Sequence, residues 1–152
     1  SSPGKNRRPM KFLADANFLL ALTADIHAHH NLAHRWWTVQ RAGGEVGICR
    51  PMQSALLRLL CTSAVMGKEA KTLTQAWSVY AVLIDSGCFF FAPEPSGLVL
   101  AWERLCRPYG SSPKVVMDAY LAAFAECGGY TLVSFDRAFS QFKGVKWLCP
   151  GA

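Results

Sequence analysis

The stretch SSPKVVMDAYLAAFAECGGYTLVSFD, residues 111–136, has the pattern of a complete helix followed by a turn and a strand. Ser112 can cap the helix, Pro113 suits its first turn, and Gly128 can end it. The run TLVSF at 131–135 is short and apolar, which is typical of a strand buried on both faces. One aspartate interrupts a helix that is otherwise almost wholly apolar between Val115 and Ala125, and a second comes directly after the strand. The stretch therefore predicts both an α/β fold and a place for polar chemistry within it.

Four more apolar runs alternate with helical patterns along the rest of the chain. The predicted strands are 11–16, 45–49, 88–92, 131–135 and 145–149. Helices are expected directly after the first strand, over 27–42, from Pro51, from Thr72 or Thr74 to about Ser86, over 97–107, over 113–128, and briefly before the last strand. Strands separated by helices in this way favour a three-layer α/β/α fold with a central, mainly parallel five-stranded sheet.

The composition fits a single globular domain. The chain has 152 residues, of which 51% are hydrophobic and 17% charged, enough to bury a sizeable core. We assign residues 10–152 to this domain and interpret residues 1–9 as a tag remnant or a disordered basic arm. The net charge is +6, and it falls to +3 from Met10 onward, where 13 basic residues face 10 acidic ones. That mild excess permits a polyanionic partner without requiring one.

Two further features bear on the compartment. No apolar run approaches the roughly 20 residues that span a bilayer, and the first residues lack the apolar segment of a secretory signal. The six cysteines form no CxxC pair, so free, mostly buried thiols are expected rather than disulfides or a zinc site. The sequence therefore predicts a cytoplasmic protein with no membrane partner.

Few acids lie where an open α/β sheet places its ligands, at the carboxyl ends of the strands. Asp15 ends the first strand, Asp136 follows TLVSF, and Asp118 lies on the apolar helix. Each has an ordinary alternative: Asp15 and Asp136 can cap the segments after them, and Asp118 can pair with Lys114 one turn earlier. Three carboxylates brought together repel one another, and a bound cation such as Mg²⁺ or Mn²⁺ relieves that repulsion.

Four segments taken in order make the pattern specific. They are FLADANFLLAL, CRPMQSALLRLLCTSAVMG, VVMDAYLAAFAECGGYTLVSFDRAF and KGVKW. Over residues 11–149 the chain resembles the PIN-domain family, and most closely the VapC-type toxin ribonucleases of bacterial toxin–antitoxin pairs. A phosphatase with Asp15 as its nucleophile is disfavoured, because Asn17 stands where that chemistry requires a second aspartate.

The resemblance implies a site. The first, third and fourth acids of the family fall on Asp15, Asp118 and Asp136, which would be catalytic residues and metal ligands. Asn17 and Ser134 match neighbouring positions that hold a carboxylate or a metal-bound water.

The second acid of the family is a glutamate, and its position falls on Gln53. The resemblance therefore implies a catalytic position at which a neutral amide replaces the carboxylate. This departure has three explanations: an engineered change that silences a toxin, a natural variant of reduced activity, or a register displaced by one residue.

The resemblance also implies an activity and partners. The family uses one or two divalent cations to activate a water against an RNA phosphodiester, which leaves a 5′-phosphate and a 3′-hydroxyl. A homodimer is implied, with a small VapB-like antitoxin that covers an apolar groove and directs an arginine towards the acids. Candidates for contact with the RNA backbone are Arg50, Lys114, Arg137 and Lys143. The alternative is a non-catalytic PIN scaffold that binds RNA or protein.

Overall fold

A five-stranded parallel sheet forms the centre of the protein. The structure is a computed structural model that describes residues 10–40 and 44–151. The strand order is β3-β2-β1-β4-β5, and each neighbouring pair is parallel. The strands are β1 (Met10–Ala14), β2 (Gly44–Ile48), β3 (Phe89–Phe91), β4 (Thr131–Val133) and β5 (Trp147–Leu148). The predicted sheet is confirmed.

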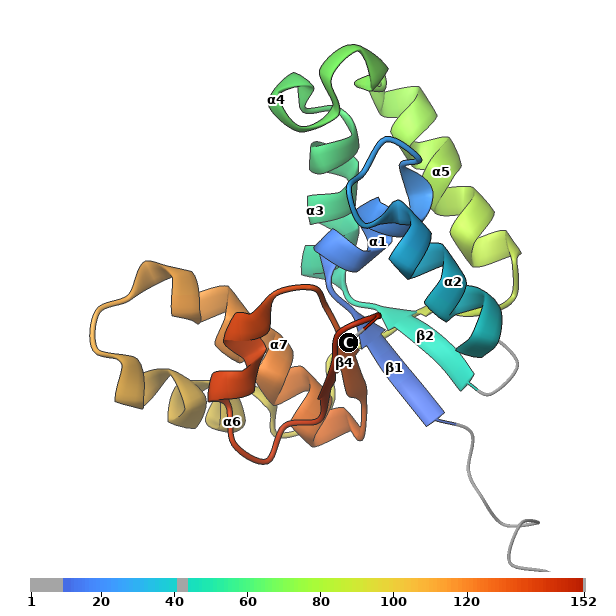
Figure 1. The fold of residues 1–152 in the computed structure, drawn as a ribbon. Helices are drawn as coiled ribbons and strands as arrows, with labels where there is room; N and C mark the ends of the chain where they lie inside the picture. The colour runs from blue at the N-terminus through green and yellow to red at the C-terminus, as the bar shows by residue number, and fades with distance from the viewer. Residues whose placement is uncertain (1–9, 41–43, 152) are drawn as a thin grey trace, which may run out of the picture.

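Within residues 10–40 and 44–151, seven α-helices and three short 3₁₀ segments connect the strands. The helices are α1 (Ala16–Thr23), α2 (His30–Gln40), α3 (Arg50–Leu60), α4 (Ser63–Met66), α5 (Leu73–Asp85), α6 (Leu98–Cys106) and α7 (Pro113–Gly128). The 3₁₀ segments are η2 (Gly67–Glu69), η3 (Arg107–Tyr109) and η4 (Arg137–Gln141). Figure 1 shows α6 and α7 on one side of the sheet, and α1, α2, α3 and α5 on the other. The three-layer α/β/α prediction is therefore also confirmed.

Local sequence signals account for some of the helix ends. Thr72 begins α5 with a capping box, in which its hydroxyl accepts from Gln75 N–H and the Gln75 side chain accepts from Thr72 N–H. Ser112 does precede α7, but its hydroxyl makes no capping hydrogen bond. The left-handed residue that ends α7 is Gly129, with φ of 73°, so the helix includes Gly128.

Some sequence predictions need adjustment. The segment α4–η2 was not predicted, because SAVM and GKE are too short to show a helical period. The helix expected over 27–42 starts at His30, and its expected end lies outside the described residues, as do residues 1–9.

The core surrounds the central strand β1 and the inner face of α7. Phe12 of β1 and Phe18 of α1 both meet the Trp36 ring edge-on, at centroid distances of 5.1 and 5.3 Å. The seven residues 119–125 of α7 are all buried, so this helix is packed deeply against the sheet. Asp118 stands immediately before that buried run, at the margin of the core. Among the described residues, no helix combines the length and apolarity required to cross a membrane.

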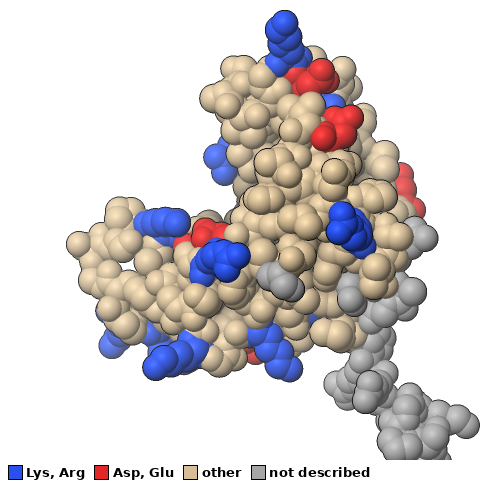
Figure 2. Space-filling view, in the orientation of Figure 1, with Lys and Arg blue, Asp and Glu red and all other residues tan. Residues whose placement is uncertain are grey.

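The parallel sheet brings one end of every strand to the same edge. β1 and β2 end at Ala14 and Ile48, so Asp15 and Cys49 start the loops that lead into α1 and α3. In Figure 1 these two helices begin at the base of a notch between the α3–α5 arm and the α6–α7 arm. The notch is open to solvent in the space-filling view (Figure 2), where acidic and basic side chains lie together on its α6–α7 side. The fold therefore places the predicted site at the base of this notch.

Candidate active site

Asp15 occupies the position between β1 and α1, and both of its carboxylate oxygens are engaged. Oδ1 accepts from the Ala16 amide at 2.7 Å, so the capping role expected as the ordinary alternative is present. Oδ2 accepts from the Ser134 hydroxyl at 2.7 Å, across from the end of β4. Asp15 can therefore cap α1 and still bind a metal ion, because an ionised carboxylate has more lone pairs than these two hydrogen bonds use.

Ser134 is fully buried and connects three of the predicted site residues. Its hydroxyl donates to Asp15 and accepts from the Asn17 amide nitrogen at 3.1 Å and from the Asp136 backbone amide at 3.0 Å. Asn17 in turn accepts from the Phe135 backbone amide at 3.2 Å. This network fixes the loop after β4 against the start of α1.

Asp136 lies at the other end of this network. Its Oδ1 accepts from the Ala138 amide at 2.9 Å and caps η4, as the ordinary alternative predicted. Its Oδ2 lies 3.8 Å from the ammonium group of Lys114, a pair exposed enough to contribute little to stability. The nearest carboxylate to Lys114 is therefore that of Asp136 rather than that of Asp118, the partner that the sequence suggested.

Asp118 is the unusual member of the group. Its Oδ2 is buried and has no hydrogen-bond partner within the described part of the chain. Burial raises the pKa of Asp118, the charge of Asp136 raises it further, and Lys114 lowers it. A buried, unpaired carboxylate oxygen is costly, so a folded protein that retains one often has a use for it, such as catalysis or the binding of an ion.

The three acids share one electrostatic environment. Burial is the main cause that raises the pKa of Asp15, and the charges of Asp118 and Asp136 also raise it. The hydrogen bonds from Ser134 and Ala16 act in the opposite direction and favour the ionised form. The site is thus short of positive charge, which a cation would supply.

These residues fit a hydrated divalent cation better than a closed cage. Within residues 10–40 and 44–151, no three His, Cys, Asp or Glu side chains are grouped tightly enough to enclose a metal ion. Mg²⁺ typically keeps several waters and takes only one or two carboxylates directly. The unpartnered Asp118 oxygen and the free lone pairs of Asp15 and Asp136 are the ligands available for such an ion.

Gln53 lies in the first turn of α3 and is 6% exposed. Its side-chain oxygen accepts from Arg50 Nη1 at 2.5 Å, and the Arg50 guanidinium lies over the Phe91 ring, 4.4 Å from its centroid. The adjacent Met52 sulfur accepts from the Ala16 amide at 3.3 Å, so the first turns of α1 and α3 touch. Gln53 is therefore close to the segment that carries Asp15, with its amide oxygen committed to an arginine.

The four predicted cations differ in their surroundings. Arg50 is held by Gln53 and Phe91, and Lys114 is paired with Asp136. Arg137 and Lys143 are exposed, and neither has a carboxylate within ion-pair distance in the described ranges.

Sequence reasoning missed two residues beside the site. Phe91 is the last residue of β3, and the Arg50 guanidinium lies over its ring. Glu94, three residues later, accepts a hydrogen bond from the Tyr120 hydroxyl at 2.9 Å. Burial raises the pKa of Cys49 to about 11, and the charges of Asp15 and Glu94 contribute, which places both carboxylates near this thiol. The strand-end rule that selected Asp15 could also have selected Glu94, because it follows the third predicted strand.

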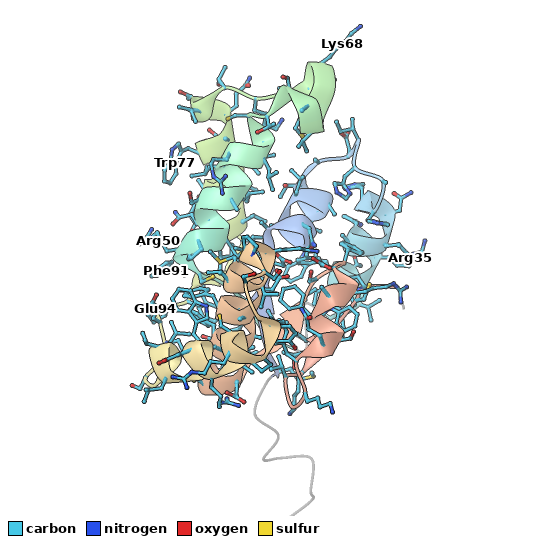
Figure 3. The ribbon with its side chains drawn as sticks, turned by 90° about the vertical axis from the view of Figure 1, so that its left-hand side faces the viewer. Arg35, Arg50, Lys68, Trp77, Phe91 and Glu94 are labelled. Atoms are coloured by element: carbon cyan, nitrogen blue, oxygen red, sulfur yellow. The ribbon has the colours of Figure 1, made fainter. Side chains whose placement is uncertain are left out.

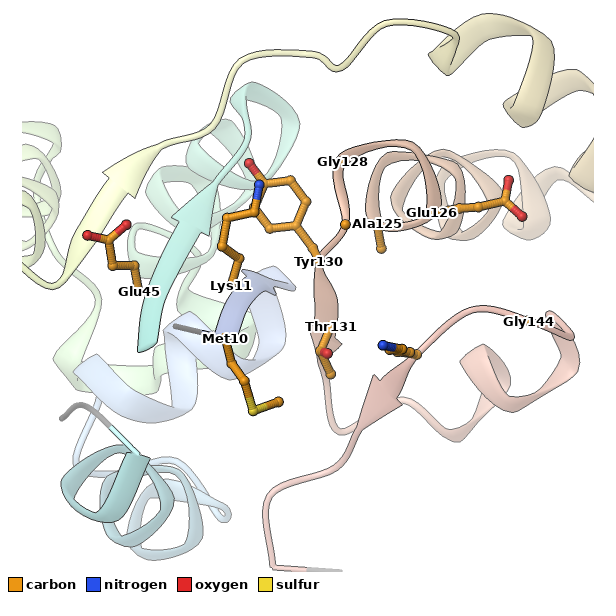
Figure 4. Close-up of a pocket in the computed structure, with 11 residues that line it drawn as sticks. Met10, Lys11, Glu45, Ala125, Glu126, Gly128, Tyr130, Thr131 and Gly144 are labelled. Carbon is orange, nitrogen blue, oxygen red and sulfur yellow. The ribbon is translucent and has the colours of Figure 1, made fainter. Parts of the chain in front are cut away.

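A separate cavity opens at the opposite edge of the sheet. It has a volume of about 740 Å³ and is lined by the starts of β1 and β4 together with the end of α7 (Figure 4). Lys11 lies over the Tyr130 ring in this cavity, 4.4 Å from its centroid. None of the predicted site residues lines it, so this cavity is distinct from the acidic site.

The chain belongs to the PIN-domain family: the family described as "PIN domain" matches residues 12–145. Among its curated relatives is Ribonuclease VapC41 of Mycobacterium tuberculosis, 40% identical over 138 residues, which cover 88% of this chain and 94% of the relative. Ribonuclease VapC29 of the same organism is 30% identical over 142 residues, 93% and 98% of the two chains.

Solved structures agree on the fold. VapBC2 from Rickettsia felis, bound to a DNA fragment from its promoter, superposes with a TM-score of 0.71 at 12% identity, covering 92% of this chain and 98% of that chain. Mycobacterium tuberculosis VapC20, a sarcin-ricin loop cleaving toxin, gives a TM-score of 0.65 at 23% identity, covering 88% and 95%.

The Ser134 network yields a first prediction. Ser134→Ala leaves the part-buried Asp15 Oδ2 without its donor and the part-buried Asn17 amide without an acceptor, at a cost of about 1–3 kcal/mol for each group that water does not reach. We expect a lower urea midpoint in chemical denaturation. Ser140→Ala, which removes an exposed hydroxyl bonded within η4, is the matched control and should change little. An unchanged midpoint for Ser134→Ala would show that water replaces the hydroxyl.

Proposed function

We propose that this chain is a Mg²⁺- or Mn²⁺-dependent endoribonuclease and the toxin of a VapBC-like pair. The observation that carries the proposal is the buried, unpartnered oxygen of Asp118, which lies in the field of Asp15 and Asp136 at the carboxyl edge of the sheet. The relatives named as ribonucleases support the same reaction class.

The side chains around the site would have three roles: to hold the cation, to position a ligand of the cation and to bind the RNA. Asp15, Asp118 and Asp136 would hold the cation, and Ser134 keeps the Asp15 carboxylate oriented towards the site. When bound, a divalent cation lowers the pKa of a water to make a nucleophile and offsets charge on the phosphate. Lys114, Arg137 and Lys143 would bind the flanking RNA phosphates, which the acids alone would repel.

We further propose a VapB-like antitoxin as the protein partner, a homodimer as the functional form, and the cytoplasm as the compartment. The solved VapBC complexes that share the fold support the first of these. The free state of all six cysteines agrees with the compartment.

The test is cleavage of a structured RNA panel by the purified chain with Mg²⁺, with Mn²⁺ and with EDTA. We expect cleavage that requires the divalent cation, with products that carry a 5′-phosphate and a 3′-hydroxyl, as identified by mass spectrometry. Products with a 2′,3′-cyclic phosphate, or equal cleavage in EDTA, would contradict metal-activated water as the nucleophile. Absence of cleavage by both this chain and Gln53→Glu would favour the non-catalytic scaffold.

A further inference from the structure

Two side-chain contacts hold the Arg50 guanidinium in place. Its guanidinium is held by Gln53 at 2.5 Å and lies over the Phe91 ring, although Arg50 itself is exposed. Within the described residues it forms no ion pair with a carboxylate. An arginine that is fixed in place while its charge remains available is suited to a ligand that is both planar and anionic.

Aromatic side chains continue on the same face. Phe91 is 41% exposed and Trp77 of α5 is 51% exposed, and Trp77 meets the Tyr80 ring edge-on at 6.1 Å. Burial raises the pKa of Tyr80 and the Arg50 charge lowers it, which places this phenol near the guanidinium. Figure 3 shows Trp77, Arg50, Phe91 and Glu94 following one another down one side of the molecule, with Arg35 on the opposite side.

The position of this group relative to the acids is set by the sheet. β2 lies between β1 and β3, so the residues after its end are adjacent to Asp15 on one side and to Phe91 on the other. The contact between Met52 and Ala16 joins the first turn of α3 to the start of α1. A nucleotide on Arg50 would therefore be a neighbour of a phosphate bound at the acids.

We propose that Arg50 and Phe91 form a stacking platform for an unpaired nucleotide beside the scissile phosphate, and that Gln53 is the positioning residue that fixes the guanidinium. Unpaired bases stack on aromatic rings and on guanidinium planes, whereas paired bases are not available to do so. The inference rests on the proposed function and adds the residues that would receive an unpaired nucleotide beside the cleavage site, Arg50 and Phe91.

The side chain of Gln53 suits this role because it is neutral. It accepts the Arg50 hydrogen bond without placing a negative charge against the guanidinium. The full charge of Arg50 therefore remains available to the nucleotide phosphate.

The experiment measures binding of a fluorescein-labelled single-stranded RNA by anisotropy in EDTA, where cleavage does not interfere. The same strand annealed to its complement is the duplex probe. We expect Arg50→Lys and Phe91→Ala each to weaken single-strand binding about fivefold or more, since one stacked base contributes about 1–3 kcal/mol. Duplex binding should change less than about twofold. Arg35→Lys, the same substitution on the opposite face, is the control.

Two further readouts separate stacking and positioning from charge. Arg50→Lys should keep the salt dependence of binding, because the charge remains, whereas Lys114→Ala should lower its slope by about one unit. Gln53→Leu should weaken single-strand binding in the parent chain but not in the Arg50→Lys background, because it acts through Arg50. A urea titration establishes that Gln53→Leu is folded.

Three results would overturn the inference. They are equal binding by Arg50→Lys and Arg35→Lys, equal losses for the single strand and the duplex, and a change of oligomeric state in sedimentation velocity for Phe91→Ala. The last result would assign this face to a protein interface instead. Because binding is measured without metal, cleavage by the parent chain together with any of these results would leave the proposed function standing.

Discussion

Asp118→Asn should reduce metal-dependent RNA cleavage by roughly a thousandfold. A metal-bound site contributes several kcal/mol of charge stabilisation in the transition state, and each 1.36 kcal/mol corresponds to about tenfold in rate. Asparagine keeps the shape of the side chain and removes the charge of the oxygen that has no partner in the described residues. The measurement is single-turnover cleavage in saturating Mn²⁺.

The same substitution should stabilise the metal-free protein. Burial and Asp136 raise the pKa of Asp118, so at neutral pH its ionised form opposes folding. Because the pKa of Asp118 is higher in the folded protein than in the unfolded chain, ionisation of Asp118 lowers the free energy of unfolding. This loss of stability is absent below the pKa of an aspartate in the unfolded chain and is complete once the pH has risen through the folded pKa. Replacing the charge with an amide should raise the melting temperature in EDTA at pH 7 by roughly 2–4 °C, for about 1 kcal/mol.

The control for both effects is Asp85→Asn. Asp85 is exposed at the end of α5, before β3 begins, and so lies at the opposite edge of the sheet. It should alter neither cleavage nor melting. If Asp118→Asn cleaved RNA as well as the parent chain, or melted at a lower temperature in EDTA, the carboxylate would be structural rather than catalytic. The thermal gain should also shrink near pH 3, where aspartate is largely protonated in the unfolded chain.

The fold could be predicted because its signals are local and repeated. The apolar run before Asp15, the Pro113 and Gly128 limits of α7, and the TLVSF strand each fix an element without knowledge of the others. Parallel strands then place their carboxyl ends together, which explains why the structure brings Asp15, Ser134 and Asp136 into one hydrogen-bond network.

What the sequence could not supply were contacts between side chains on different elements. The sequence around Lys114 does not indicate that this lysine approaches Asp136, because the spacing of four residues on a helix favours a pair with Asp118. Likewise, the Phe91–Arg50 contact depends on β3 being the neighbour of β2, a matter of sheet order. The interpretation of Gln53 as an acid position without its charge came from the family pattern alone, and it stays a prediction.

Gln53→Glu provides the test of that position, and we expect its effect to depend on Arg50. The new carboxylate would lie against the guanidinium that now donates to Gln53 Oε1, so most of its charge would be neutralised by that ion pair. Mn²⁺ affinity, measured by calorimetry, should therefore improve less than about threefold in Gln53→Glu. Against an Arg50→Ala background, the same change should improve it by about tenfold or more, which corresponds to about 1.4 kcal/mol.

The matched control is Gln75→Glu, which adds the same charge near the start of α5. Gln75 already serves in a capping box, and glutamate fills that role equally well. It should leave Mn²⁺ affinity unchanged in both backgrounds. Equal gains for Gln53→Glu with and without Arg50 would show that the arginine does not screen the site. No gain in either background would place Gln53 outside the metal's reach, and its function would then be confined to holding Arg50 on Phe91.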